Sequence, residues 1–269
     1  MLFRSEVYHM SAPNYYKYNM IHFERSRSWQ SSIFNDVVTH LCERFSAKLN
    51  WDERRLNQAK IQQYARAIER VGGVKGIWGF IDGTLRSICR PTKNQKNWYS
   101  GYKKTHAFKY QAIMIPDGLI SHLGGPFEGK LGDWAAWKEA GLEDRLRLLN
   151  EGVPPEEQVY LYRDPAYTVA YGIMGAYKAQ PGNPLDATLE ALNSHMSSLR
   201  VSVEHGYGKT ASLWSFNTHP RNMKMGLSPV AGYYMVSVLF TNIHTCMHGS
   251  QTSKQFGINP LTFDRYLQL

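Results

Sequence analysis

The chain has 269 residues, enough for one large domain, and its hydrophobic content of 43% can supply a folded core, which excludes wholesale disorder. Lysine and arginine (31) outnumber aspartate and glutamate (22), and the net charge of +9 favours either a surface that binds a polyanion such as nucleic acid or an ordinary basic enzyme. The three cysteines form no C-x-x-C pair, so neither a structural zinc site nor a disulfide scaffold is expected.

Residues 1–75 predict a helical N-terminal region. Residues 1–28 are polar and aromatic without an apolar period, and we expect them to be irregular. Apolar residues at helical spacing then predict one helix over 31–45 and a second over 52–71, with Asp52 as the N-cap of the second.

The main domain, predicted over residues 76–269, begins with strand signals. Four apolar runs bounded by turn residues predict strands: 77–81, 108–115, 119–123 and 159–162. The second and third of these runs flank a Pro-Asp-Gly turn and predict a hairpin. The first run ends in Asp82 and the last in Asp164, which places two acids where open α/β sheets carry their sites, at the carboxyl ends of strands.

Helices are predicted between and after these strands. Helical spacing of apolar residues indicates helices over 132–149, 189–206 and 229–247. The last of these is the most apolar stretch, but its serine, threonine, asparagine and histidine residues favour a buried helix over a membrane span. The order of elements therefore predicts an α/β fold in which helices pack against a mixed sheet.

Four acids are candidate metal ligands, although each has an ordinary structural explanation. Metal-assisted phosphodiester cleavage needs convergent carboxylates, which a fold can gather from distant parts of the chain. Asp82 could be part of a turn, Asp133 a helix N-cap, and Asp164 the first residue of a turn before a proline. Glu204 could pair with Arg200, one helical turn earlier.

Longer motifs resemble a known family. GFIDGTLRSICRP at 79–91, the run from 94 to 120, GGPFEGKLGDW at 124–134, YRDPAY at 162–167 and MSSLRVSVEHGYG at 196–208 resemble the PIF/Harbinger class of DDE transposases and their domesticated nuclease relatives. The resemblance covers about residues 76–260 and implies an RNase-H-like mixed sheet flanked by helices. It also implies a DNA endonuclease or transposase that uses Mg²⁺ or Mn²⁺, with strand transfer as a further step in a full transposase.

The resemblance assigns roles to the four acids. Asp82, Asp164 and Glu204 match the catalytic carboxylates, and all three, with Asp133, match residues that bind metal. The motifs depart from the family in two places: LGDW lacks the histidine and serine often found around its aspartate, and Arg163 replaces a usual glycine. A domesticated protein with the same fold that binds DNA or a partner without cutting is the alternative.

The family also implies a cellular setting. A nuclear location and DNA as a partner follow from the resemblance, and so does a separate Myb-like DNA-binding protein. We expect weak sequence-specific recognition by this chain alone, because the region before the core is shorter than in relatives. A homo-oligomer remains open, and no membrane partner is expected.

A basic segment lies between the first acid and the predicted hairpin. Aromatic residues alternate there with cations, which could stack on bases and neutralise phosphates. The candidate DNA-binding residues are Lys93, Lys96, Lys103, Lys104, His106 and Lys109. A loop and edge strand with solvated lysines and core aromatics is the alternative.

Overall fold

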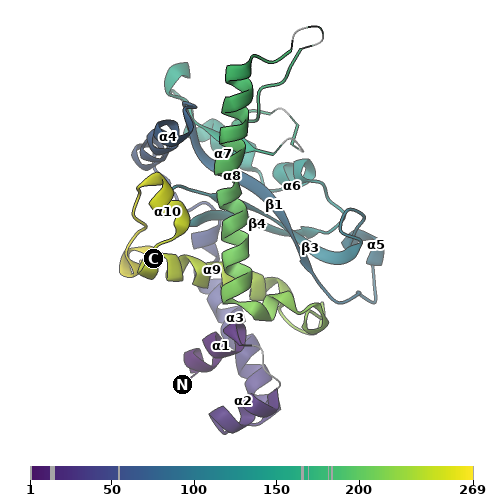
Figure 1. Ribbon diagram of the computed structural model, residues 1–269. Helices are drawn as coiled ribbons and strands as arrows, with labels where there is room; N and C mark the ends of the chain where they lie inside the picture. The colour runs from purple at the N-terminus through teal and green to yellow at the C-terminus, as the bar shows by residue number, and fades with distance from the viewer. Residues whose placement is uncertain are drawn as a thin grey trace.

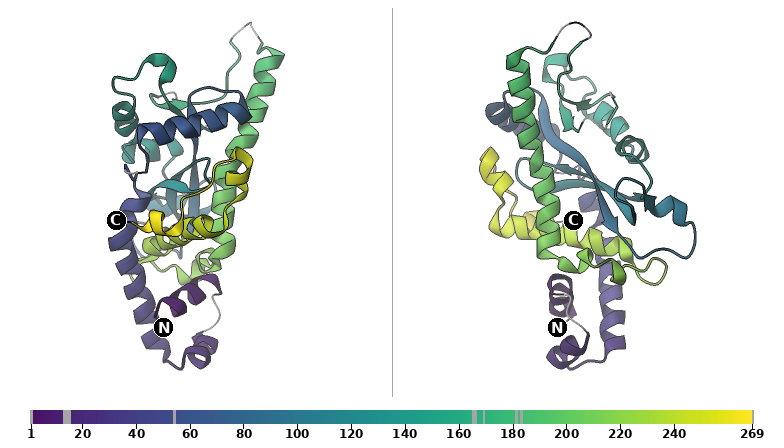
Figure 2. Two further views of the ribbon diagram at one scale, coloured as in Figure 1. Left: turned by 90° about the vertical axis from the view of Figure 1, so that its left-hand side faces the viewer. Right: turned by 45° about the vertical axis from the view of Figure 1, so that its right-hand side comes forward.

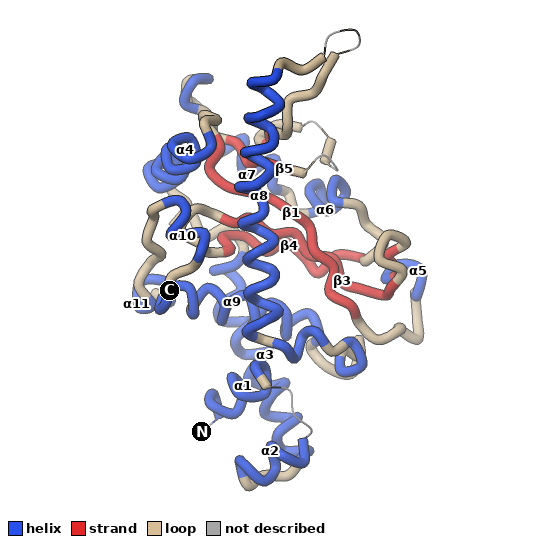
Figure 3. Tube along the Cα trace, viewed as in Figure 1, coloured by secondary structure: helices blue, strands red, loops and turns tan. Residues whose placement is uncertain are grey.

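The computed structural model describes residues 2–12, 16–53, 55–164, 167–168, 170–180, 182 and 184–268. Six strands form one sheet: β1 (Ile77–Ser87), β2 (Tyr99–Ser100), β3 (Thr105–Met114), β4 (Ile120–Glu128), β5 (Tyr160–Arg163) and β6 (Ile173–Met174). Their order is β2-β3-β1-β5-β6, and β4 pairs with β3 from Phe108 to Met114. The two longest strands, β1 and β3, cross the centre of the molecule (Figure 3).

The sheet is mixed, as the sequence predicts. β1 pairs with β3 antiparallel, in a register that sets Asp82 opposite Ala112, and with β5 parallel. β3 and β4 form the predicted antiparallel hairpin, whereas β5 and β6 are parallel. Asp82 therefore lies in the middle of β1, with five more strand residues after it, because the strand continues well past the predicted end at residue 81.

Helices cover both faces of the sheet. They are α1 (Leu2–Ser11), α2 (Tyr16–Phe23), α3 (Arg27–Leu49), α4 (Gln58–Gly72), α5 (Gln95–Trp98), α6 (Asp133–Glu139), α7 (Leu142–Leu149), α8 (Ala187–Leu213), α9 (Val230–His248), α10 (Gln251–Phe256) and α11 (Phe263–Leu267). The long helix α8 crosses one face of the sheet (Figure 1), and α6 and α7 lie on the other side (Figure 2). This open mixed sheet flanked by helices is consistent with the RNase-H-like fold expected.

The N-terminal region differs from the prediction in two ways. Residues 1–28 were expected to be irregular, but α1 and α2 form there, and only residues 1 and 13–15 lie outside the described part. Their order comes from packing between distant segments: Tyr8 stacks on His22 at 5.3 Å between ring centroids, and Met10 is fully buried. Asp52 as an N-cap is wrong, because α4 begins later and Asn57 caps it by accepting the Lys60 N–H.

The other helix predictions hold with changed bounds. The segment 132–149 forms two helices because Gly141 lies between them in a left-handed conformation with φ 63°. The segment 189–206 lies within the longer α8. The apolar segment 229–247 forms α9, which buries Ser237, Thr241 and Asn242. Within the described part of the chain, no helix is long and apolar enough to cross a bilayer.

Candidate functional site

Asp82 is held at a fixed place on β1 by the backbone of Gly83 and by α8. Its Oδ1 accepts a hydrogen bond from the Gly83 N–H at 2.8 Å. The Tyr207 hydroxyl donates to the backbone carbonyl of Asp82 at 2.6 Å and accepts the Ala112 N–H of β3 at 3.1 Å. Tyr207 thus ties α8 to both central strands beside the acid.

A single guanidinium joins three of the four candidate acids. Arg200 on α8 contacts Asp82 Oδ2 at 3.3 Å, Asp164 Oδ2 at 3.5 Å and Glu204 Oε1 at 3.4 Å. Its side chain is 16% exposed, whereas that of Glu204 is 52% exposed. The ion pair of Glu204 with Arg200 that the sequence suggested is therefore present, but the same arginine also reaches the acids of β1 and of the segment after β5. We refer to these four residues as the Arg200 cluster.

Asp133 approaches β1 from the opposite face of the sheet. Its helix, α6, has Gly132 as the N-cap, so Asp133 is the first helical residue rather than the cap. A Cβ added to Gly83 would overlap Asp133 Oδ1, and successive strand residues face opposite sides, so Asp133 lies on the side away from the Asp82 side chain. Lys109 Nζ pairs with Asp133 Oδ1 at 2.9 Å.

The negative charges are close enough to alter ionisation. The pKa of Asp82 is raised to about 6, chiefly because burial disfavours the charged carboxylate. The charges of Asp133 and Asp164 act in the same direction. The Gly83 N–H and Arg200 oppose this shift because they stabilise the ionised form. The site thus concentrates acids that need a cation nearby.

The oxygen donors suit a hard divalent cation, but the side chains hold protein cations instead. Carboxylate oxygens are the ligands that Mg²⁺ prefers, and three of them face one point at the Arg200 guanidinium. Among the residues that the structure describes, no three His, Cys, Asp or Glu side chains are arranged to hold an ion. The carboxylates of Asp82, Asp164 and Glu204 nevertheless supply the oxygen ligands that a divalent ion prefers, so these are the residues that could hold one.

The basic segment is largely exposed. Lys93, Lys96, Lys103 and Lys104 are exposed, and His106 is partly exposed. Tyr102 is 85% exposed, with Lys103 Nζ 5.0 Å from its ring centroid. We call residues 93–106 the basic-aromatic hairpin.

Lys109 does not belong to this exposed surface. It is 7% exposed because its side chain lies on the face of the sheet that α6 covers, where it pairs with Asp133. The basic-aromatic hairpin lies at one end of the sheet (Figure 1). Ser87 pairs with Ala107, so the hairpin begins about 17 Å from Asp82 along the strand, at roughly 3.3 Å per residue.

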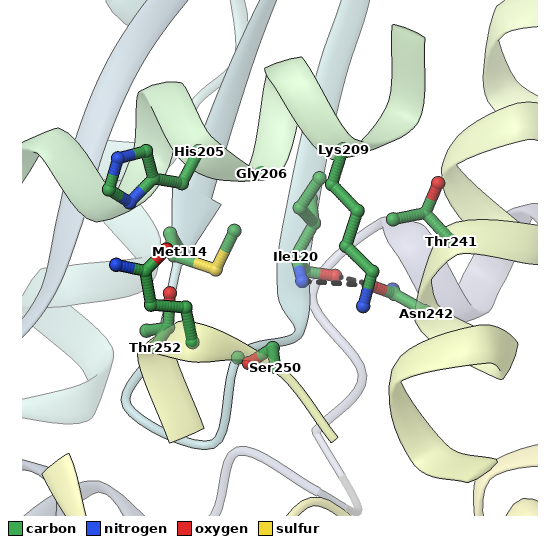
Figure 4. Close-up of a pocket in the computed structure, with 11 residues that line it drawn as sticks. Met114, Ile120, His205, Gly206, Lys209, Thr241, Asn242, Ser250 and Thr252 are labelled. Carbon is green, nitrogen blue, oxygen red and sulfur yellow. Dashed lines mark hydrogen bonds between the residues drawn. The ribbon is translucent and has the colours of Figure 1, made fainter. Parts of the chain in front are cut away.

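A separate pocket lies on the other side of α8. Its volume is about 230 Å³, and its walls come from α8, α9, α10 and the β3–β4 turn (Figure 4). Lys209 is nine residues from Arg200, which places it about half a turn around the helix. Its ammonium donates to Thr245 Oγ1 at 2.8 Å and to the Gly249 carbonyl at 3.2 Å. No carboxylate lines this pocket, so it is distinct from the Arg200 cluster.

Sequence reasoning found the acids but missed Arg200 as a common partner. The available signal was an arginine one turn before Glu204 on the same helix face. Its reach to Asp82 and Asp164 depends on the packing of α8 across the sheet, which the spacing along the chain does not reveal.

Comparison with protein families gives one match. A family model described as DDE superfamily endonuclease matches residues 81–242, which is 162 of the 269 residues. The matched region contains all four candidate acids and Arg200. Comparisons with curated proteins and with solved structures gave no match.

Proposed function

Since the chain belongs to the DDE superfamily endonucleases, we propose that it cleaves DNA phosphodiester bonds in a reaction that depends on Mg²⁺ or Mn²⁺. The observation that carries the proposal is the convergence of Asp82, Asp164 and Glu204 on one point, from three different elements. We assign these three as the catalytic carboxylates. Asp133, on the other side of β1, is a further metal-associated residue.

The chain's own residues position the reacting groups. Asp82 is fixed by the Gly83 N–H and by Tyr207, so its carboxylate is held in place before any ligand arrives. A divalent cation held there would stabilise negative charge on the phosphate and lower the pKa of a bound water. Glu204 is half-exposed, and it therefore presents its carboxylate to the solvent side of the site, from which a DNA strand would approach.

We also propose that the basic-aromatic hairpin contacts DNA beside the cut. Its exposed lysines can neutralise phosphates, and Tyr102 offers an aromatic face. The spacing of about 17 Å from Asp82 corresponds to about five base pairs of duplex. Lys109 is left out of this surface, because it is buried against Asp133.

Finer assignments rest on the motif resemblance. The long ordered motifs favour the PIF/Harbinger class, and with it a nuclear location, a separate Myb-like DNA-binding partner and strand transfer after cleavage. The division into a helical region over 1–75 and an endonuclease domain over 76–269 is part of the same proposal.

A second function is favoured by one specific observation. Each of the four acids is paired with a protein cation, three with Arg200 and one with Lys109. Such pairing would also suit a domesticated protein that binds DNA or a partner and does not cut. In such a protein the acids bind no metal, and the arginine and lysine neutralise their charge.

Cleavage of a labelled DNA duplex separates these functions. We expect cutting that requires Mg²⁺ or Mn²⁺, that is lost in Glu204→Gln and that persists in Glu190→Gln, a matched change at an exposed position of α8. Circular dichroism should show the same fold in all three proteins. Cutting that survives in Glu204→Gln would refute the site. No cutting of duplex, single-stranded or end-like DNA by any of them would favour the binding protein.

A further inference from the structure

The Arg200 cluster contains one cation for three acids. The guanidinium makes three contacts between 3.3 and 3.5 Å, which are longer than the best charge-assisted hydrogen bonds. Its single positive charge leaves the cluster with a formal charge of −2 when all three acids are ionised. The cluster therefore keeps a net negative charge that attracts a further cation even with Arg200 in place.

Arginine suits this position because its charge is permanent and its donors form a fork. A guanidinium carries five N–H donors in one plane and does not lose its proton in proteins. Its NH1 reaches β1, and its NH2 reaches both the acid after β5 and the acid one turn along α8. One side chain can thus stabilise three carboxylates that would otherwise repel one another.

We infer that Arg200 is an internal counter-cation, which holds the three carboxylates together in the metal-free chain and competes with the divalent ion for the same oxygens. This inference rests on the proposed function. The same oxygen atoms cannot fully serve the guanidinium and a divalent ion, and two cations in one site repel each other. Metal loading therefore requires Arg200 to give up part of its contacts, which raises the metal concentration that the chain needs.

The competing role and a purely structural role predict opposite results. If Arg200 only organised the acids, its removal would scatter them and weaken metal binding. If it competes, its removal strengthens metal binding while it destabilises the metal-free chain, because three carboxylates lose their cation. The three ion pairs have the modest strength typical of partly exposed pairs, and together they predict a gain in Mn²⁺ affinity of roughly tenfold.

The test is calorimetric titration of the full chain with Mn²⁺, without DNA. Arg200→Gln removes the charge and keeps a polar side chain, and we expect about tenfold tighter binding. Arg200→Lys keeps one charge without the fork, so its affinity should lie between those of Arg200→Gln and the unaltered chain. Asp82→Asn should abolish or strongly weaken binding in every background. Thermal melting in EDTA should show a lower midpoint for Arg200→Gln, and added Mn²⁺ should raise that midpoint more than it does in the unaltered chain.

Each outcome bears on a different statement. Equal or weaker Mn²⁺ binding by Arg200→Gln overturns the inference and leaves the metal-dependent nuclease in place. No Mn²⁺ binding by any of the proteins refutes the proposed function, and the inference falls with it. If Arg200→Gln does not fold in EDTA, Arg200→Lys decides: binding tighter than in the unaltered chain supports competition, and binding no tighter overturns it.

Discussion

Gly83 leaves the space that Asp133 needs beside β1, and its replacement by alanine tests whether that approach matters. A methyl group at this position would lie 3.1 Å from Asp133 Cγ and 3.3 Å from Lys109 Cε, and it would overlap Asp133 Oδ1. Ordinary contacts between carbon atoms need about 3.5 Å or more, so the carboxylate has to move by roughly 1 Å. The backbone has no such conflict, because a strand accepts alanine better than glycine.

Gly83→Ala should therefore separate activity from stability. A misplacement of about 1 Å can cost about 100-fold in rate even when the substitution lies away from the reacting atoms, and we expect a loss of this size in DNA cleavage because Asp133 is a metal-associated residue of the proposed site. The side chain of Asp133 is 25% exposed and can move towards solvent, and the roughly 0.5–1 kcal/mol that alanine gains over glycine inside a strand offsets part of the cost of moving it, so the free energy of unfolding should fall by no more than about 1 kcal/mol.

Single-turnover cleavage with Mn²⁺ and urea unfolding measure the two quantities. The matched control is Gly208→Ala on α8, where an added Cβ meets no heavy atom within 4 Å. We expect the control to cut at the original rate. Cleavage by Gly83→Ala at the original rate would refute the reasoning, since it would show that the position of Asp133 against β1 does not affect the chemistry.

Three further predictions concern stability and DNA binding. Burial lowers the pKa of His122 to about 4, so the folded chain keeps the ring neutral while the unfolded chain takes up a proton below 6.5, and stability is lost as the pH falls from 6.5 towards 4. Urea unfolding at pH 7.5 and 4.5 measures this loss, and His122→Leu should make the fall in the free energy of unfolding between the two pH values smaller by up to about 3 kcal/mol. A fall as large as in the unaltered chain would contradict this origin. Gly129→Ala places a methyl group against two backbone carbonyl oxygens and should destabilise the fold by about 1–3 kcal/mol, whereas Gly101→Ala, with open space around it, should melt at the original temperature. Lys103→Gln should weaken DNA binding and lower the salt dependence of the affinity by about one phosphate contact, whereas equal weakening by Lys254→Gln on α10 would argue against a role of the hairpin.

Sheet architecture was the most predictable part of this fold. The strands of the hairpin and the strand before Asp164 could be found because apolar runs end at strong turn residues. β1 was underestimated because its residues from Asp82 to Ser87 are all partly exposed and form no apolar run, and pairing with β3 extends the strand. The end of β1 is set by backbone pairing with β3, a distant segment, and the local pattern of apolar residues does not predict it.

The N-terminal helices and the charged partners could not be predicted for a similar reason. α1 and α2 lack a clear apolar face, and their order comes from contacts such as Tyr8 with His22. Lys109 stands in a run of exposed lysines, yet the sheet carries it into a buried ion pair. The sequence identified which residues carry charge, whereas only the packing of helices on the sheet shows which charges meet.

Within two turns, the helix α8 carries three residues that contact the acids or the backbone of β1, and this restricts how its sequence can diverge in evolution. Arg200, Glu204 and Tyr207 lie on one side of the helix, where they reach the acids and the backbone of β1. Inserting or deleting one residue between Arg200 and Tyr207 would rotate one end relative to the other by about 100° and break the arrangement at once. Point substitutions on the outer face of this helix should be tolerated during divergence, but its length between these residues should not vary among descendants that keep the same chemistry.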